Sequence, residues 1–248
     1  MLRYLPIIFS IAVYAMEFST SCLAACEKPS YKIVLDVGHT EEEPGAISAR
    51  GIPEYRFNLG LAMDVYNQLN SKGFNSADLL ITKGYGVETL RSRSAYANSN
   101  NADLFISIHH DSVQPLYMKQ WLVDGRSRYY SDDFKGYSIF VVDNNSRSQE
   151  SLNLAILLSN ELMSRGMTFT THHAMNIKGE RRSFIDEKRG IYRFNELAVL
   201  RGNKAVSILL EAGVIVNREE EVALAAPQRR RLIANAIVAA ISRFCEVQ

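Results

Sequence analysis

The sequence predicts a single α/β domain with a mostly parallel central sheet and helices on both faces. Apolar runs of strand length alternate with longer amphipathic stretches along most of the chain. No internal repeat, low-complexity tract or Pro/Ser-rich linker divides the chain into parts. Such alternation is typical of buried parallel strands joined by helices that cover the sheet.

The elements follow in order from the spacing of the apolar residues. In the first expected helix, Phe57, Leu61, Val65 and Leu69 recur at four-residue spacing, and Gly73 follows as a stop. We expect strands over 31–37, 79–82, 104–108, 137–142 and 205–210, and helices over 57–72, 89–100, 148–165 and 227–244. The polar, poorly periodic stretches 113–135 and 168–195 are expected to be loops over a site.

Composition and charge exclude several classes of protein. Hydrophobic residues make up 47% of the 248 residues and charged residues 22%, which excludes intrinsic disorder and a multi-spanning membrane protein. The 28 Lys and Arg residues nearly balance the 27 Asp and Glu residues, so the net charge is +1. A protein dedicated to nucleic acid would need a basic face, and we therefore expect no nucleic-acid partner.

The first 25 residues are typical of a secretory signal peptide. Arg3 precedes the apolar run 5–16, and small residues lead to Ala24-Ala25 just before Cys26. The sequence thus predicts a signal peptide at 1–25, a mature domain at 26–248, and export to the periplasm or cell envelope. The apolar run is too short to span a bilayer, although a retained N-terminal anchor is the alternative.

Cys26 has two possible roles. Leu23-Ala24-Ala25-Cys26 resembles a bacterial lipobox, in which Cys26 would carry a lipid anchor. Alternatively, a disulfide between Cys26 and Cys245 would join the two ends of the domain in an oxidising compartment. We favour a soluble exported protein, and intact mass under non-reducing conditions would decide between the two.

Four titratable residues are candidates for a metal centre. His39, His109 and Glu211 come just past the ends of expected strands, and Glu54 lies just before the first helix. Groups beyond the carboxyl ends of parallel strands converge on one crevice. Two imidazoles and one carboxylate suit Zn²⁺ with a fourth position for water, and a further carboxylate, Glu211, can shuttle protons. Taken one at a time, such residues more often have a structural role. Burying a carboxylate directly after the apolar run 206–210, however, costs free energy unless the group is paired or functional.

Four ordered blocks of sequence resemble one enzyme family. Residues 33–39 with 44–46 resemble its opening block, 51–54 with Asn58-Leu59 its second-ligand block, and 102–109 its most specific block, preceded by Leu90, Arg93 and Ala97-Asn98. Residues 196–201, 208–213 and Asn217 resemble its C-terminal block. Together they resemble the zinc-dependent N-acetylmuramoyl-L-alanine amidases of the bacterial cell-separation type, the amidase-3 family.

The resemblance implies that His39, Glu54 and His109 are zinc ligands and that Glu211 is the catalytic carboxylate. It implies hydrolysis of the amide between N-acetylmuramic acid and L-alanine of the stem peptide, with peptidoglycan as the binding partner. Val37 stands where the family usually has proline. The expected strand 137–142 runs almost directly into the helix 148–165, so we expect no autoinhibitory helix there.

Two other functions and two other segments complete the sequence-based expectations. The chain could instead be a non-catalytic peptidoglycan-binding regulator, or a zinc peptidase that cuts within stem peptides. His172-His173 are expected to be solvated or to face substrate rather than to bind metal. Aromatic residues of 113–135, among them Trp121 and Tyr130, form either a wall for glycan or peptide, or a small local core.

Overall fold

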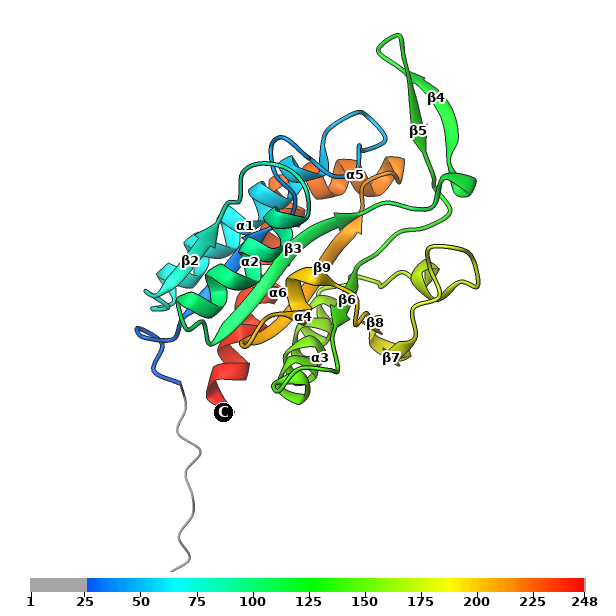
Figure 1. The fold of residues 1–248 in the computed structure, drawn as a ribbon. Helices are drawn as coiled ribbons and strands as arrows, with labels where there is room; N and C mark the ends of the chain where they lie inside the picture. The colour runs from blue at the N-terminus through cyan, green and yellow to red at the C-terminus, as the bar shows by residue number, and fades with distance from the viewer. Residues whose placement is uncertain (1–25, 248) are drawn as a thin grey trace, which may run out of the picture.

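The computed structural model describes residues 26–247, and the predicted signal peptide lies outside them. A seven-stranded sheet runs through the fold in the order β2-β1-β3-β9-β6-β8-β7. Its strands are β1 Ile33–Val37, β2 Ala77–Leu80, β3 Leu104–Asp111, β6 Ser138–Val141, β7 Phe184–Asp186, β8 Ile191–Arg193 and β9 Val206–Val214. The predicted α/β class is confirmed (Figure 1).

The sheet is parallel on one side and mixed on the other. Strands β2, β1, β3 and β9 pair in parallel, so their carboxyl ends lie along one edge. β6 runs antiparallel to β9 but parallel to β8, and β7 is antiparallel to β8. The predicted mostly parallel sheet is thus confirmed, and its reversed strands lie beyond β9.

Helices cover both faces of the sheet, as predicted. They are α1 Glu54–Ser71, α2 Val87–Ser99, α3 Ser148–Ser164, α4 Ala198–Arg201, α5 Arg218–Ala225 and α6 Pro227–Glu246. Side chains of α1, α3 and α6 form one core with Leu35, Ile106 and Ile208. Side chains of α2 and α4 form the other with Phe105 and Leu209. Alternate residues of each strand therefore contact opposite layers.

The two stretches expected to be loops contain regular structure. Residues 113–135 hold a 3₁₀ turn, η1 Pro115–Tyr117, and the antiparallel hairpin of β4 Lys119–Val123 and β5 Arg126–Tyr130. Figure 1 shows this hairpin projecting from the body. Residues 168–195 hold η2 His172–Ala174, β7, η3 Glu187–Arg189 and β8. The expectation of irregular loops was wrong here because short strands gain their stability from neighbours distant in sequence.

The hairpin has one packed face and one exposed face. Trp121 lies against Tyr130, donates from Nε1 to the Ala49 carbonyl, and has the Arg218 guanidinium over its ring. Leu122 and Tyr129 point the other way and are exposed. The inward aromatic residues therefore form a small local core, and the role of the outward face as a substrate wall stays a prediction.

A disulfide joins the two ends of the described chain. Cys26 and Cys245 are bonded with a Cα–Cα distance of 5.0 Å, and the Cys26 backbone N–H donates to the Cys245 carbonyl. Of the two roles left open for Cys26, the structure has the disulfide. A sulfur in a disulfide cannot also carry a thioether-linked lipid. Within residues 26–247, no helix is long and apolar enough to cross a membrane.

Candidate metal and catalytic site

The site begins with two side chains on neighbouring strands. His109 of β3 and Glu211 of β9 are partners in the parallel register, on the sheet face that α2 and α4 cover. Both residues lie inside their strands rather than just past them, which corrects the sequence-based boundaries. Compared with the expected ends, β3 is three residues longer and β9 four, because the register pairing extends to Asp111 and Val214.

His39 follows β1 in a conformation that few side chains adopt. Its φ of 66° is in the left-handed region, where a residue with a Cβ is strained. The buried Arg93 of α2 fixes this turn by donating to the Val37 and His39 carbonyls and to the Asp36 carboxylate. Gly38 precedes His39 because a Cβ at that position would overlap the His109 ring.

Glu54 is the first residue of α1, where the helix dipole favours a carboxylate. It is only 3% exposed. The Ala46 backbone N–H donates to Oε2 over 3.1 Å, and Asn58 Nδ2 donates to Oε1 over 3.1 Å. A Cβ on Gly45 would overlap both Glu54 Oε2 and the His39 ring, so glycine leaves this side of the group open. The carboxylate is thereby held in one orientation.

His39, Glu54 and His109 come together from three separate elements. His39 Nε2 lies 3.0 Å from Glu54 Oε2, and His109 Nδ1 lies 3.0 Å from Glu54 Oε1. One candidate ligand atom from each residue lies within 4.8 Å of the others. The two imidazole centroids are 4.9 Å apart, close to the roughly 5 Å expected for two imidazoles on one tetrahedral ion. Nitrogen and oxygen donors in this arrangement fit a divalent transition metal.

The charge on Glu54 matches this role. Burial by itself raises the pKa of a carboxyl group, but the hydrogen bonds and charges of His109 and His39 hold the pKa of Glu54 well below its usual range. The group therefore keeps an ionised carboxylate between two imidazoles.

Glu211 lies in the same cavity as the two histidines. The cavity has a volume of about 430 Å³, and its lining includes His39, His109 and Glu211. Burial raises the pKa of Glu211 well above its usual value, and the nearby carboxylates of Asp111 and Glu54 raise it further. Its Oε2 is buried and makes no hydrogen bond with any described residue. A carboxyl group with an elevated pKa and an unused oxygen suits proton transfer.

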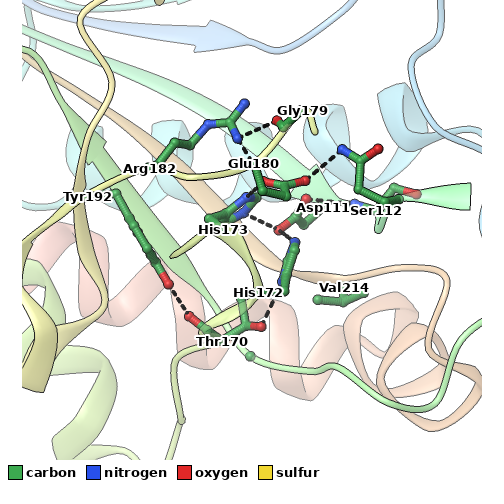
Figure 2. Close-up of polar contacts among 12 residues, drawn as sticks. Asp111, Ser112, Thr170, His172, His173, Gly179, Glu180, Arg182, Tyr192 and Val214 are labelled. Atoms are coloured by element: carbon green, nitrogen blue, oxygen red, sulfur yellow. Dashed lines mark hydrogen bonds and ion pairs between the residues drawn. The ribbon is translucent and has the colours of Figure 1, made fainter. Parts of the chain in front are cut away.

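A second group of histidines lies around Asp111 of β3 (Figure 2), and His173 and Asp111 line the same cavity. His173 Nε2 is 2.8 Å and His172 Nε2 3.3 Å from Asp111 Oδ2, and these three residues form the Asp111–His172–His173 cluster. Both histidine side chains are less than 10% exposed. The expectation that they are solvated was wrong, because β3 supplies a carboxylate that lies 62 residues from His173 in sequence.

The sequence alone did not identify several residues that orient the site. His110 Nδ1 donates to Asn58 Oδ1 over 2.8 Å, and Asn58 Nδ2 donates to Glu54, so Asn58 links the other two side chains. The Arg93–Asp36 ion pair is buried and supports the His39 turn. His110 points away from His109, toward Phe57 and Asn58 of α1, as alternation along the strand predicts.

The fold and the His–Glu–His group together define an α/β protein with a site compatible with a metal ion. The chain belongs to the N-acetylmuramoyl-L-alanine amidase family, whose model matches residues 33–243. The name of the family describes hydrolysis of the amide between N-acetylmuramic acid and L-alanine, the activity of a peptidoglycan amidase.

Known proteins similar in sequence carry the same name. The chain is 25% identical to the N-acetylmuramoyl-L-alanine amidase AmiC of Neisseria meningitidis, over 86% of this chain and 52% of that protein. It is 26% identical to AmiA of Escherichia coli, over 86% of this chain and 75% of that one. The chain thus spans about half the length of the Neisseria relative.

Solved structures have the same fold. The N-acetylmuramyl-L-alanine amidase Ami1 of Mycobacterium smegmatis superposes with a TM-score of 0.68 at 19% identity, over 90% of this chain and 100% of that chain. The amidase AmiC2 of Nostoc punctiforme superposes with a TM-score of 0.59 at 25% identity, over 86% and 95%. At 19% identity, the similarity to Ami1 establishes the fold alone.

Proposed function

We propose that this chain cleaves the muramoyl–alanine amide with a Zn²⁺ ion held by His39, Glu54 and His109, and that Glu211 moves the protons. One observation carries the proposal. Three donor residues from three elements converge within 4.8 Å, and a buried carboxyl group with an unused oxygen lies in the same cavity. When bound, zinc supplies a Lewis acid that polarises a carbonyl and lowers the pKa of a water molecule.

Glu211 performs the proton transfers in this proposal. Its carboxylate takes a proton from the water that attacks the scissile carbonyl carbon, so that a new C–O bond forms. It then delivers that proton to the alanine nitrogen as the C–N bond breaks. The products are a free lactyl carboxylate on the sugar and a peptide with a free amino terminus.

Other residues of the chain hold the ligands in place. Arg93 fixes the carbonyl of His39, and Asn58 fixes the Glu54 carboxylate from the next turn of α1. Such supporting contacts typically contribute 10- to 100-fold to metal affinity or activity, as rough magnitudes. Arg93→Ala and Asn58→Ala are therefore expected to weaken zinc binding without removing a ligand.

The test is digestion of purified peptidoglycan by the mature protein, followed by mass analysis of the products. We expect stem peptides that begin at L-alanine, zinc at about one ion per chain, and a loss of activity of roughly 10²–10⁴-fold in Glu211→Gln with zinc retained. Cuts within the stem peptides would instead support the zinc-peptidase alternative. Binding to peptidoglycan without any release of peptides would support the non-catalytic regulator.

We further propose that residues 1–25 are removed as a signal peptide and that 26–248 form the catalytic domain in the periplasm or cell envelope. The Cys26–Cys245 disulfide supports an oxidising compartment. Intact mass of the exported protein under non-reducing conditions tests both points. We expect a mature N-terminus at Cys26 and a mass two hydrogens below the reduced form, whereas a lipid on Cys26 would contradict the disulfide.

A further inference from the structure

The cavity that contains the candidate metal ligands has a second wall with one permanent positive charge. Besides His39, His109 and Glu211, its lining includes Glu180, Arg182 and Phe194. Arg182 is the single lysine or arginine among the lining residues. Its side chain is 20% exposed and lines the cavity.

The Arg182 guanidinium is held by contacts on one side. Nη1 donates to the Gly179 carbonyl and to Glu180 Oε2, each over 2.7 Å (Figure 2). The guanidinium carbon lies 4.2 Å from the centre of the Phe194 ring. Nη2 of the planar guanidinium group makes no hydrogen bond with any described residue. A stacked guanidinium with an available N–H edge is a common arrangement for binding a carboxylate.

Glu180, which holds Arg182, is itself fixed to the sheet. Gln114 Nε2 donates to Glu180 Oε1 over 2.7 Å, and His173 Nδ1 lies 3.0 Å from Glu180 Oε2. His173 in turn contacts Asp111, which lies two residues after His109 on β3. This chain of contacts ties Arg182 to the same strand that carries a candidate zinc ligand, so the charge has a fixed place relative to the reacting bond.

The chemistry of the substrate indicates what this charge meets. The lactyl carboxyl group of N-acetylmuramic acid is consumed in the scissile amide, so the sugar side of the bond is neutral. The peptide side keeps free carboxyl groups. A fixed cation in the cavity therefore distinguishes the peptide side from the glycan side.

We propose that Arg182 is a specificity residue that binds a carboxylate of the stem peptide and so orients the peptide half of the substrate along this wall. The inference rests on the proposed amidase reaction and deepens it. Charge-assisted hydrogen bonds of this kind contribute roughly 10- to 100-fold to discrimination, since a buried polar group is left unpaired when the partner is missing.

The test uses N-acetylmuramoyl tripeptides whose carboxyl groups are amidated one at a time, with kcat/KM measured for each. For the wild-type protein, we expect amidation of one carboxyl group to lower kcat/KM by at least about 10-fold, mainly through KM. In Arg182→Ala, the values of kcat/KM for the free and the amidated tripeptide should lie within about 2-fold of each other. Arg182→Lys, which keeps the charge but loses the planar guanidinium group, should retain part of the wild-type difference.

Arg181→Ala is the matched control, because it removes an exposed positive charge from the neighbouring position in the same segment. It should keep the wild-type ratio, which separates a specific contact from general electrostatic attraction. Thermal unfolding checks that each variant is folded. If Arg182→Ala does not fold, Arg182→Lys still tests the proposal.

The possible failures are distinguishable. Equal cleavage of all the tripeptides by the wild-type protein would overturn the role of Arg182 while leaving the amidase function intact. The role of Arg182 would also be overturned if Arg182→Ala and Arg182→Lys both kept the full wild-type preference for the free carboxyl group. No cleavage of any muramoyl peptide would instead overturn the proposed function itself.

Discussion

Two clusters of the same residue types, two histidines and a carboxylate each, border one cavity but differ in chemistry. In the His39–Glu54–His109 cluster the ring centroids are 4.9 Å apart, and His39 is 33% exposed. In the Asp111–His172–His173 cluster the centroids are only 3.9 Å apart, and both rings are nearly buried. Candidate ligand atoms lie within 4.8 Å of one another in both clusters, but the ring spacing of the first is nearer the roughly 5 Å of two imidazoles on one tetrahedral ion.

The two clusters also differ in how their charges are balanced. In the second cluster, burial opposes protonation of His173, but Asp111 and Glu180 raise its pKa to about 9. With Arg182 on Glu180, two positive groups face two carboxylates. Buried charges are tolerated when they are paired in this way. The comparison teaches that histidine and carboxylate content does not define a metal site; ring spacing, access and charge balance do.

The strongest test of the comparison is a matched pair of variants. His39→Ala removes a ligand from the first cluster, and we expect zinc to fall from about one ion per chain to near zero and kcat/KM to fall by at least about 10³-fold. His172→Ala removes the corresponding histidine from the second cluster and should leave zinc content unchanged. Elemental analysis of both proteins makes the measurement, and metal loss in His172→Ala would break the distinction.

A second prediction concerns stability. Asp111→Asn removes the carboxylate charge that faces His173. Because breaking a buried ion pair leaves an uncompensated charge, we expect the free energy of unfolding to fall by about 3 kcal/mol. Urea unfolding measures it, with Asp143→Asn, which breaks the exposed pair with Arg193, as the control. Equal effects of the two substitutions would show that the second cluster is not a stabilising network.

The smallest expected effect is on pH dependence. The pKa of His173 is about 9 in the folded state and near 6.5 when unfolded. A raised pKa contributes stability that is fully present below pH 6.5 and is lost as the pH rises through 9. In His173→Gln, the difference in unfolding free energy between pH 6.5 and 9 should shrink by about 1–3 kcal/mol. An unchanged pH profile would mean that His173 is neutral when folded.

The sequence predicted the parallel part of the fold, and the roles of the four candidate site residues stay a prediction. Strands β1, β3 and β9 are continuous apolar runs, and His39, His109 and Glu211 follow from where such runs end. The structure then brings His39, Glu54 and His109 together, and Glu211 lines the same cavity as the two histidines.

The remaining features depend on contacts that no local pattern contains. The hairpin of β4 and β5 alternates apolar and polar residues too weakly to be recognised, and its inward face is defined by Ala49 and Arg218 from distant segments. The burial of His172 and His173 depends on Asp111, and the position of Arg182 depends on Glu180. Each partner lies on another segment or in a turn with no periodic signal.

The central claim is that one metal ion binds between His39, Glu54 and His109 and none binds at the second cluster. Anomalous diffraction at the zinc edge from crystals of the zinc-loaded protein tests it most directly. We expect a single strong peak within bonding distance of the two imidazoles and the Glu54 carboxylate. A peak beside Asp111, His172 and His173, or no peak at the first cluster, would contradict it.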